Sequence, residues 1–493
     1  MKSVPAMQLA QDKLCLYHYQ MPGNYCREFS QMPSDPTKLA ILADFGNFQI
    51  YGILVIYLPS FIMALFIGSW SDKYLSAKKL IMINSAIAII LESIILILCD
   101  YFAESSIYLM LLIGLPNLIS GGLMGSLGAC WTYLVTTTPG HMRAMRITVA
   151  EVIMGLSGPL GSYLGGYIIN TPTWLSSGVD HQLHNSTAVF IIDGLVYGLS
   201  ILWIWWAIDE ARDIRNWELE FGLPYESDGL TVDQRVAGKL ENYDKHRESG
   251  HSPVRLLFTW SNLKNIWHTC AKSRPNYVRL QIWLLFLANL CYMIVKSGPV
   301  AYLMPFTQTV YKWDSSQYST GVAITNLSET VVQLLASPVL IMVLKLKDTT
   351  VSALGMASYG IQNLVRGLVL TPDGFYYSII AGCLGSIASV GLRSHFSRIL
   401  KPRELGALFS CFTCIEGLTP IVAGVIFNEI FKHTVQTGWP GCMLLVAAGI
   451  QNLVRGLVLT PDGFYYSIIA GCFWVSIASV GLRSHFSRIL KPQ

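Results

Sequence analysis

The chain has 493 residues, of which 52% are hydrophobic and only 13% charged, with a mean hydropathy of +0.46. Soluble domains carry about 25% charged residues, so a soluble fold of this length would lack the polar side chains needed to cover its surface. The net charge of +4 is small and forms no basic stripe, which argues against a nucleic-acid partner. The composition predicts an all-α polytopic membrane protein.

Apolar segments recur along the whole chain. A helix that crosses a bilayer needs about 20 mostly apolar residues, and about a dozen segments meet this requirement. They are 48–69, 79–99, 107–129, 147–169, 188–208, 281–304, 320–344, 349–370, 374–393, 406–430, 439–459 and 463–483. Many contain Gly, Ser or Pro, which allow membrane helices to approach one another closely. We therefore expect each segment to form a spanning helix.

Lys and Arg gather in every second connection, namely in 70–79, 141–146, 209–279, 345–347 and 398–403. Because basic loops stay in the cytoplasm, these connections define the inner side of the membrane. Residues 1–47 then lie on the outer side, where disulfides are permitted. Cys15 and Cys26 either pair there or remain two free thiols. Asn185 begins an Asn-Ser-Thr sequon in an outer loop and is a candidate for glycosylation.

The spans fall into two groups separated by a long charged loop, as in transporters built from two rocking bundles. The predicted divisions are an outer segment 1–47, a five-span bundle 48–208, a cytoplasmic loop 209–279, a six-span bundle 280–459 and a final segment 460–493. We expect the protein to lie in the plasma membrane or an endolysosomal membrane.

The first basic loop carries the clearest motif. It contains Gly68, Asp72, Lys73, Lys78 and Lys79 and resembles the loop motif of the major facilitator superfamily. In this motif the Asp pairs with basic groups at the cytoplasmic mouth, where a salt bridge can hold one conformation and break in the other. The second Gly of the motif is absent here, and the loop has one extra residue.

Further features resemble one branch of that superfamily, the proton-coupled folate transporter family. They are the Cys15…Cys26 segment, Arg393 to Arg398 with Glu404 to Ser410, Ile426-Phe427-Asn428, and Glu151 with the Gly- and Pro-rich helix that follows it. The resemblance covers residues 13–449. It implies a two-bundle helical fold and a secondary transporter of an organic solute, often anionic and commonly driven by protons.

Charged side chains inside the spans are the candidate site residues. A charge at bilayer depth costs at least about 2.5–3.5 kcal/mol and usually faces a cavity. Buried carboxyls can carry a proton near neutral pH, and buried cations can hold a substrate carboxylate. The candidates for proton coupling are Glu92, Glu151, Glu329 and Glu416, and those for substrate binding are Lys296, Arg366 and Arg393. The alternative is that several of them form structural ion pairs. The resemblance favours Glu151 and Arg393, which match charged positions of the family.

Two differences argue against folate itself as the substrate. Folate-transporting members place a His in the first helix of the second bundle, where this chain has Lys296 and no His. They also place an Arg and an Asp in the span that corresponds to 107–129, which carries no charge here. The chain shows no catalytic motif of a membrane enzyme, no metal-ligand spacing and no cofactor motif. We therefore expect no enzymatic activity, metal site or cofactor.

The C-terminal half contains a near-copy of itself. Residues 360–383 recur at 449–472, and residues 386–402 recur at 476–492. The predicted topology places the two copies in opposite orientations, so the second copy violates the positive-inside rule. This conflict disfavours insertion of 463–483.

By the resemblance, 48–69 corresponds to the second helix of the family, so the first helix is missing. Two functions therefore stay open: a proton-coupled transporter of a small organic solute, or a non-transporting membrane protein derived from such a transporter.

Overall fold

The computed structural model describes residues 1–32, 35–71, 77–137, 140–174, 182–209, 278–399, 402–435 and 440–459, together with residues 212, 213, 216 and 272. Every regular element in these ranges is helical. Most of the predicted cytoplasmic loop 209–279 and all of the segment 460–493, including the predicted span 463–483, lie outside the described residues.

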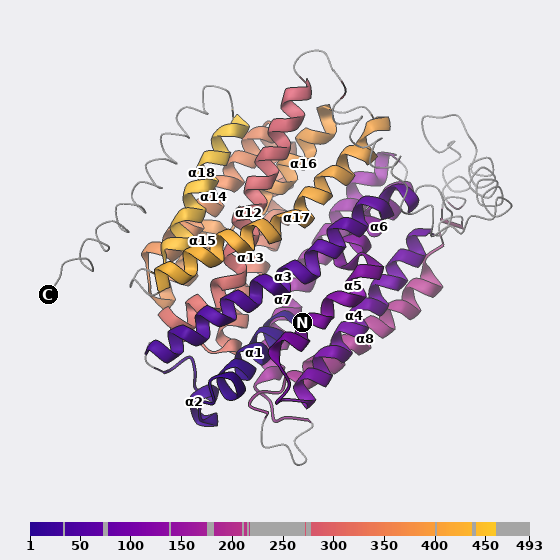
Figure 1. The fold of residues 1–493 in the computed structure, drawn as a ribbon. Helices are drawn as coiled ribbons and strands as arrows, with labels where there is room; N and C mark the ends of the chain where they lie inside the picture. The colour runs from indigo at the N-terminus through magenta and orange to yellow at the C-terminus, as the bar shows by residue number, and fades with distance from the viewer. Residues whose placement is uncertain are drawn as a thin grey trace.

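The helices form two bundles that lie side by side (Figure 1). The first contains α3 (Pro36–Ser71), α4 (Ala77–Tyr101), η2 (Ile107–Ile113), α5 (Gly114–Ser120), α6 (Gly122–Thr136), α7 (Gly140–Ile169) and α8 (Ser186–Ala207). The second contains α12 (Val278–Val310), α13 (Ser315–Pro338), η3 (Val339–Val343), α14 (Asp348–Leu368), α15 (Pro372–Gly382), α16 (Ile387–Ile399), α17 (Pro402–Val435) and α18 (Cys442–Leu459). Two helix pairs, α3 with α17 and α7 with α13, join the bundles.

Nine helices in the described part of the chain are long and apolar enough to cross a membrane, and each coincides with a predicted span. The predicted span 349–370 is the helix α14, which is absent from these nine although it is largely buried. Its polar residues, among them Asp348, Gln362 and Arg366, lower its hydropathy and face other helices. The predicted span 439–459 is α18, of which Cys442–Asn452 is a shorter apolar stretch.

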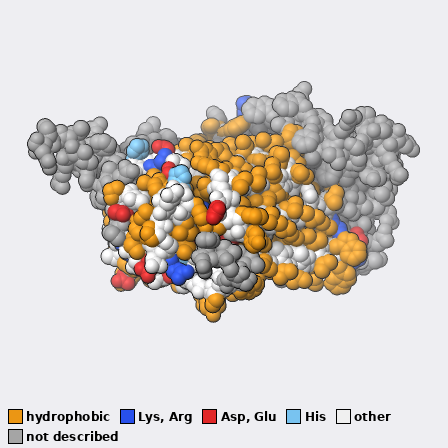
Figure 2. Space-filling model, turned by 60° about the horizontal axis from the view of Figure 1, so that its bottom comes forward, with side chains coloured by type: hydrophobic (Ala, Val, Ile, Leu, Met, Phe, Trp, Pro, Cys, Tyr) orange, Lys and Arg blue, Asp and Glu red, His pale blue; other side chains and the backbone are white. Residues whose placement is uncertain are grey.

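The space-filling view shows a broad apolar surface, with charged side chains near one end of the visible face (Figure 2). Large hydrophobic side chains such as Leu195, Leu199, Leu202 and Trp205 are each at least 64% exposed. Such a continuous apolar surface is unfavourable in water and suits the hydrocarbon of a bilayer. The fold is therefore that of a multi-pass membrane protein.

The N-terminal residues differ from the prediction of a separate outer segment 1–47. Residues 3–18 form α1 (Ser3–Lys13) and η1 (Leu14–His18), and α1 packs against α7, α8 and α13. The helix α3 begins at Pro36, so the predicted boundary at 47/48 lies inside a helix. The polar residues Lys38 and Asp44 made the first turns of α3 resemble a loop in the sequence. In the structure Lys38 donates to the carbonyl oxygens of Ser30 and Met32 at 3.2 and 2.8 Å, and Asp44 accepts from Tyr19 at 2.7 Å.

The third predicted span, 107–129, begins as η2, continues directly into α5 and is interrupted before α6 at Gly121 and Gly122. Both glycines have positive φ, 73° and 56°. A Cβ on Gly122 would lie 2.6 Å from Oδ1 of Asn117 and 2.5 Å from Oγ of Ser60, so the turn has no room for a side chain. This turn places the Asn117 amide in the interior of the first bundle.

Candidate transport pathway

Among the cations of the second bundle whose side chains the structure describes, Arg366 is the most enclosed, with 6% of its surface exposed. Its Nε donates to Oγ of Ser378 at 2.7 Å and its Nη2 to Oγ1 of Thr325 at 3.2 Å. The guanidinium carbon lies 4.3 Å from the centroid of the Phe375 ring, a distance at which the ring face attracts a cation. Among the described residues no carboxylate lies within ion-pair distance of Arg366. Its direct contacts are therefore with neutral groups, and the carboxylate of Glu329 attracts it electrostatically without forming an ion pair.

Glu329 on α13 lies between two of the predicted cations. Its carboxylate is attracted by Lys296 on α12 and by Arg366 on α14. The Lys296 ammonium lies 5.8 Å from the centroid of the Tyr292 ring on its own helix. Because Lys296 and Glu329 sit near the middle of their helices, these charges meet at bilayer depth, where uncompensated charge is most costly.

Arg393 and Glu416 form an ion pair between α16 and α17. Nη2 of Arg393 donates to both carboxylate oxygens of Glu416, at 3.0 and 3.3 Å. The Arg393 side chain remains 35% exposed, whereas that of Glu416 is 16% exposed. The arginine charge is therefore accessible to a second anion, although the geometry also fits a structural ion pair between helices.

The predicted charges of the second bundle thus form one series across its depth. Arg366 lies near the C-terminal end of α14, Lys296 and Glu329 lie near the middle of α12 and α13, and Arg393 lies near the C-terminal end of the span Pro372–His395. Lys296 and Arg393 are close enough to repel each other electrostatically. Of the five side chains, Glu416 included, three are cations and two are carboxylates, so the series carries an excess of positive charge.

In the first bundle, Glu92 is a buried carboxylate with two partners. It forms an ion pair with Lys2, and its Oε1 accepts from Nδ2 of Asn117 at 2.6 Å. Sequence reasoning missed these partners and also the buried carboxylate Asp193, which accepts from Ser93 at 3.2 Å. The signal for Asn117 and Asp193 was present, because each is a polar residue inside an apolar span.

The remaining predicted residues are spread over the structure. Gly68 lies near the end of α3, whereas Asp72, Lys73 and the side chain of Glu151 lie outside the described residues. Lys78 is buried, with 1% exposure. Nζ of Lys79 donates to the carbonyl oxygen of Trp205 at 2.6 Å, where a cation also compensates the partial negative charge at the end of α8.

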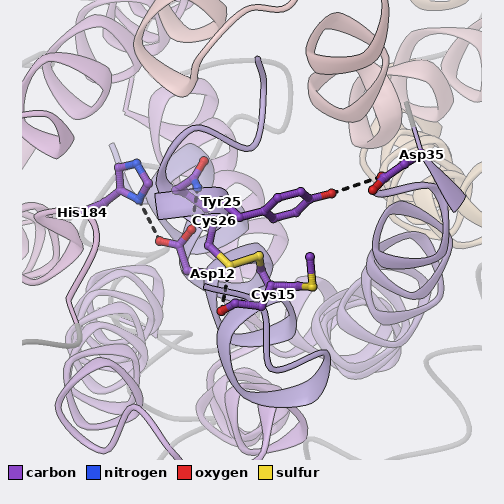
Figure 3. Close-up of a disulfide and its surroundings, with 8 residues drawn as sticks. Asp12, Cys15, Tyr25, Cys26, Asp35 and His184 are labelled. Carbon is purple, nitrogen blue, oxygen red and sulfur yellow. Dashed lines mark hydrogen bonds and ion pairs between the residues drawn. A yellow bond between two sulfur atoms is a disulfide. The ribbon is translucent and has the colours of Figure 1, made fainter. Parts of the chain in front are cut away.

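Cys15 and Cys26 form a disulfide, with their Cα atoms 5.8 Å apart (Figure 3). The bond connects η1 to α2 (Gly23–Arg27). Of the two alternatives that the sequence left open, a disulfide and two free thiols, the structure has the disulfide.

The prediction of a glycan on Asn185 is wrong for the folded chain. Asn185 is 1% exposed and is the N-cap of α8. Its Nδ2, the atom that would carry a glycan, donates to Oγ1 of Thr171 at 2.9 Å and to the carbonyl oxygen of Pro172 at 2.8 Å. The side chain satisfies backbone groups at a helix start, a role for which Asn is among the preferred residues.

The sequence model of the Major Facilitator Superfamily matches residues 34–424. The chain belongs to this superfamily. The match confirms the predicted transporter class and two-bundle fold, and it excludes a membrane enzyme.

Relatives support the predicted branch of the superfamily. The chain is 23% identical over 425 residues to the proton-coupled folate transporter of Bos taurus, covering 84% of this chain and 79% of the relative. It is 22% identical over 443 residues to a lysosomal proton-coupled steroid conjugate and bile acid symporter of Gallus gallus, covering 88% and 84%.

Solved structures agree on the fold. The xylose transporter XylE from E. coli matches with a TM-score of 0.53 and 12% identity, covering 90% of this chain and 94% of that one. A likeness at this identity supports the fold and not the substrate.

Proposed function

We propose that the chain is a proton-coupled transporter of a small organic anion, with the charge series of the second bundle as part of its pathway. The observation that carries the proposal is Arg366, a buried guanidinium held by hydroxyl groups and an aromatic ring. A buried cation without a carboxylate partner is costly, and an anionic solute would offset that cost. Relatives named as proton-coupled transporters support the coupling to protons.

Glu329 is the carboxyl best placed to couple the two species. It lies next to Lys296 and Arg366, so its charge competes with a bound anion for the same cations. Protonation of Glu329 would free both cations for the anion, and release of the proton would displace it. One carboxyl thereby links binding of the solute to binding of the proton.

Uptake by the purified chain in liposomes tests this function. Labelled organic anions, including folates, bile acids and steroid conjugates, are offered with the outside more acidic than the lumen. We expect at least one anion to accumulate, and accumulation to fall when the proton gradient is collapsed by an ionophore. Glu329→Gln should abolish the dependence on the gradient.

The matched control is Glu429→Gln, because the Glu429 side chain is 55% exposed and pairs with Lys432 on the surface. This variant should keep gradient-driven uptake. Binding of an anion without any uptake would contradict the proposal and support the alternative, a non-transporting membrane protein.

A further inference from the structure

The helix α1 ties the two bundles together at the outer side. On the side of the first bundle, Nζ of Lys13 donates to the carbonyl oxygens of Phe102 and Ala103, just beyond the end of α4, at 3.1 and 2.9 Å. On the side of the second bundle, the amides of Gln11 and Gln308 exchange two hydrogen bonds of 3.0 Å each. Any movement that opens the outer side must break one of these attachments.

A second attachment passes through His184, in the outer loop before α8. Nδ1 of His184 lies 2.8 Å from Oδ2 of Asp12 on α1 (Figure 3). Oδ1 of Asp12 accepts from Nε2 of Gln8 at 2.7 Å, and Oε1 of Gln8 accepts from the hydroxyl of Ser315, the first residue of α13. The four residues form a continuous series of bonds from a loop of the first bundle to a helix of the second.

His184 faces charged groups from three elements. They are Asp12 on α1, Arg27 at the end of α2, and Asp314, the residue before α13. Burial disfavours the charged imidazole, but the charge of Asp12 and its hydrogen bond outweigh burial and the repulsion by Arg27. The pKa of His184 is therefore raised above its usual value of 6.5.

We propose that His184 is a proton-binding residue of the outer gate, and that its ion pair with Asp12 holds α1 across both bundles so that external acid closes the outer side. The inference rests on the proposed function, because a gate that responds to external protons serves a proton-driven carrier. The ion pair fixes Asp12 as an acceptor toward Gln8. Gln8 is thereby oriented with its carbonyl oxygen toward Ser315.

The direction of the pH dependence follows from linkage. A group whose pKa is raised in the closed form stabilises that form fully when the pH is below the ordinary pKa of the group. This stabilisation is lost as the pH rises through the raised pKa. When the outer side opens, the imidazole returns to water and to its ordinary pKa. Each unit of difference changes the ratio of closed to open molecules about tenfold. The gate should therefore open as the outer pH rises from acidic through neutral.

Thiol labelling from outside measures this opening without any substrate. Ser319 on α13 is 0% exposed and packs against Gly166 on α7. A Cβ added to Gly166 would lie 2.3 Å from the Cβ of Ser319. In Ser319→Cys, a membrane-impermeant maleimide should react slowly at acidic outer pH. The rate should rise across neutral pH, by about tenfold for each unit by which closure raises the pKa of His184. Rates are normalised to an exposed outer cysteine introduced as Asp373→Cys, after subtraction of the reaction of the native cysteines.

Two variants in the Ser319→Cys background decide the role of His184. His184→Gln should label rapidly at every pH, because its neutral amide cannot form the ion pair. The matched control is His18→Gln, because His18 lies at the end of η1 and is exposed; it should keep the full pH dependence. Gln8→Ala breaks the series beyond Asp12 without touching His184, and should also lose the pH dependence.

Retention of the normal pH profile in both His184→Gln and Gln8→Ala would overturn the inference, as would opening at acidic pH in the chain with an intact His184. Because labelling requires no solute, an absence of uptake with a normal labelling profile would count against the proposed function and leave the gate standing.

Discussion

The two copies of the repeat carry the same residues into opposite surroundings. Residues 360–368 lie in α14 and residues 449–457 in α18. The helices pack against each other antiparallel, since Gly360 faces Gln451 and Gly367 faces Gly441. Arg366 is buried near the C-terminal end of α14, whereas Arg455, its equivalent, is exposed near the C-terminal end of α18, which lies at the opposite end of the helix pair.

Local features are the same in both copies. Asn363 donates to the carbonyl oxygen of Tyr359 at 3.1 Å, and Asn452 donates to that of Ala448, also at 3.1 Å. Both copies are helical, and both place a Gln in the interior, Gln362 at 1% exposure and Gln451 at 0%. The comparison shows that sequence sets the helix and its local bonds, while the position in the bundle decides whether an arginine is a buried charge or a surface group.

The largest effect should separate the two arginines. Arg366→Met removes a costly buried charge, and the hydroxyls of Ser378 and Thr325 keep their own backbone acceptors, so we expect loss of anion uptake with a free energy of unfolding that is unchanged or higher. Arg455→Met, the matched control, should change stability by less than about 0.5 kcal/mol. Thermal unfolding in detergent and uptake in liposomes measure both. Equal losses of uptake in the two variants would show that the copies are equivalent.

An intermediate effect should come from the contact between α14 and α18, the two helices that contain the copies. A Cβ on Gly441 would lie 2.2 Å from the carbonyl oxygen of Gly367. Gly441→Ala must therefore push α18 away from α14, and we expect a loss of about 1–3 kcal/mol. Gly198→Ala is the control, because a Cβ there meets nothing within 4 Å; it should be neutral or stabilise the helix by up to about 1 kcal/mol. Unchanged stability of Gly441→Ala would mean that the two helices separate freely.

The smallest effect concerns the two buried glutamines. Gln451 has no hydrogen-bond partner among the described residues, whereas the side chain of Gln362 hydrogen-bonds Glu329. Replacing an unpaired buried amide by an apolar side chain removes a desolvation cost, so Gln451→Leu should leave stability unchanged or raise it by up to about 1 kcal/mol. Gln362→Leu should instead lower the stability, because it removes the amide that hydrogen-bonds Glu329. Equal effects of the two variants would show that the copies are equivalent at this position.

Sequence alone determined the membrane class, the spans and the set of charged residues at bilayer depth, because apolar length and the cost of buried charge are local properties. It could not decide which charges meet. The pairing of Arg393 with Glu416 joins residues on separate helices, and the ion pair of Glu92 uses Lys2 from far along the chain.

The tertiary structure also decided the positions where local patterns gave the wrong answer. The sequon at Asn185 is a buried helix cap, the polar start of α3 belongs to a long helix, and α1 packs against helices of both bundles instead of forming a separate segment. In each case a polar side chain that looked like a surface group finds its partner on another element. Burial depends on contacts between residues distant in sequence, and for that reason Arg366 and Arg455, which have identical neighbours along the chain, face opposite surroundings.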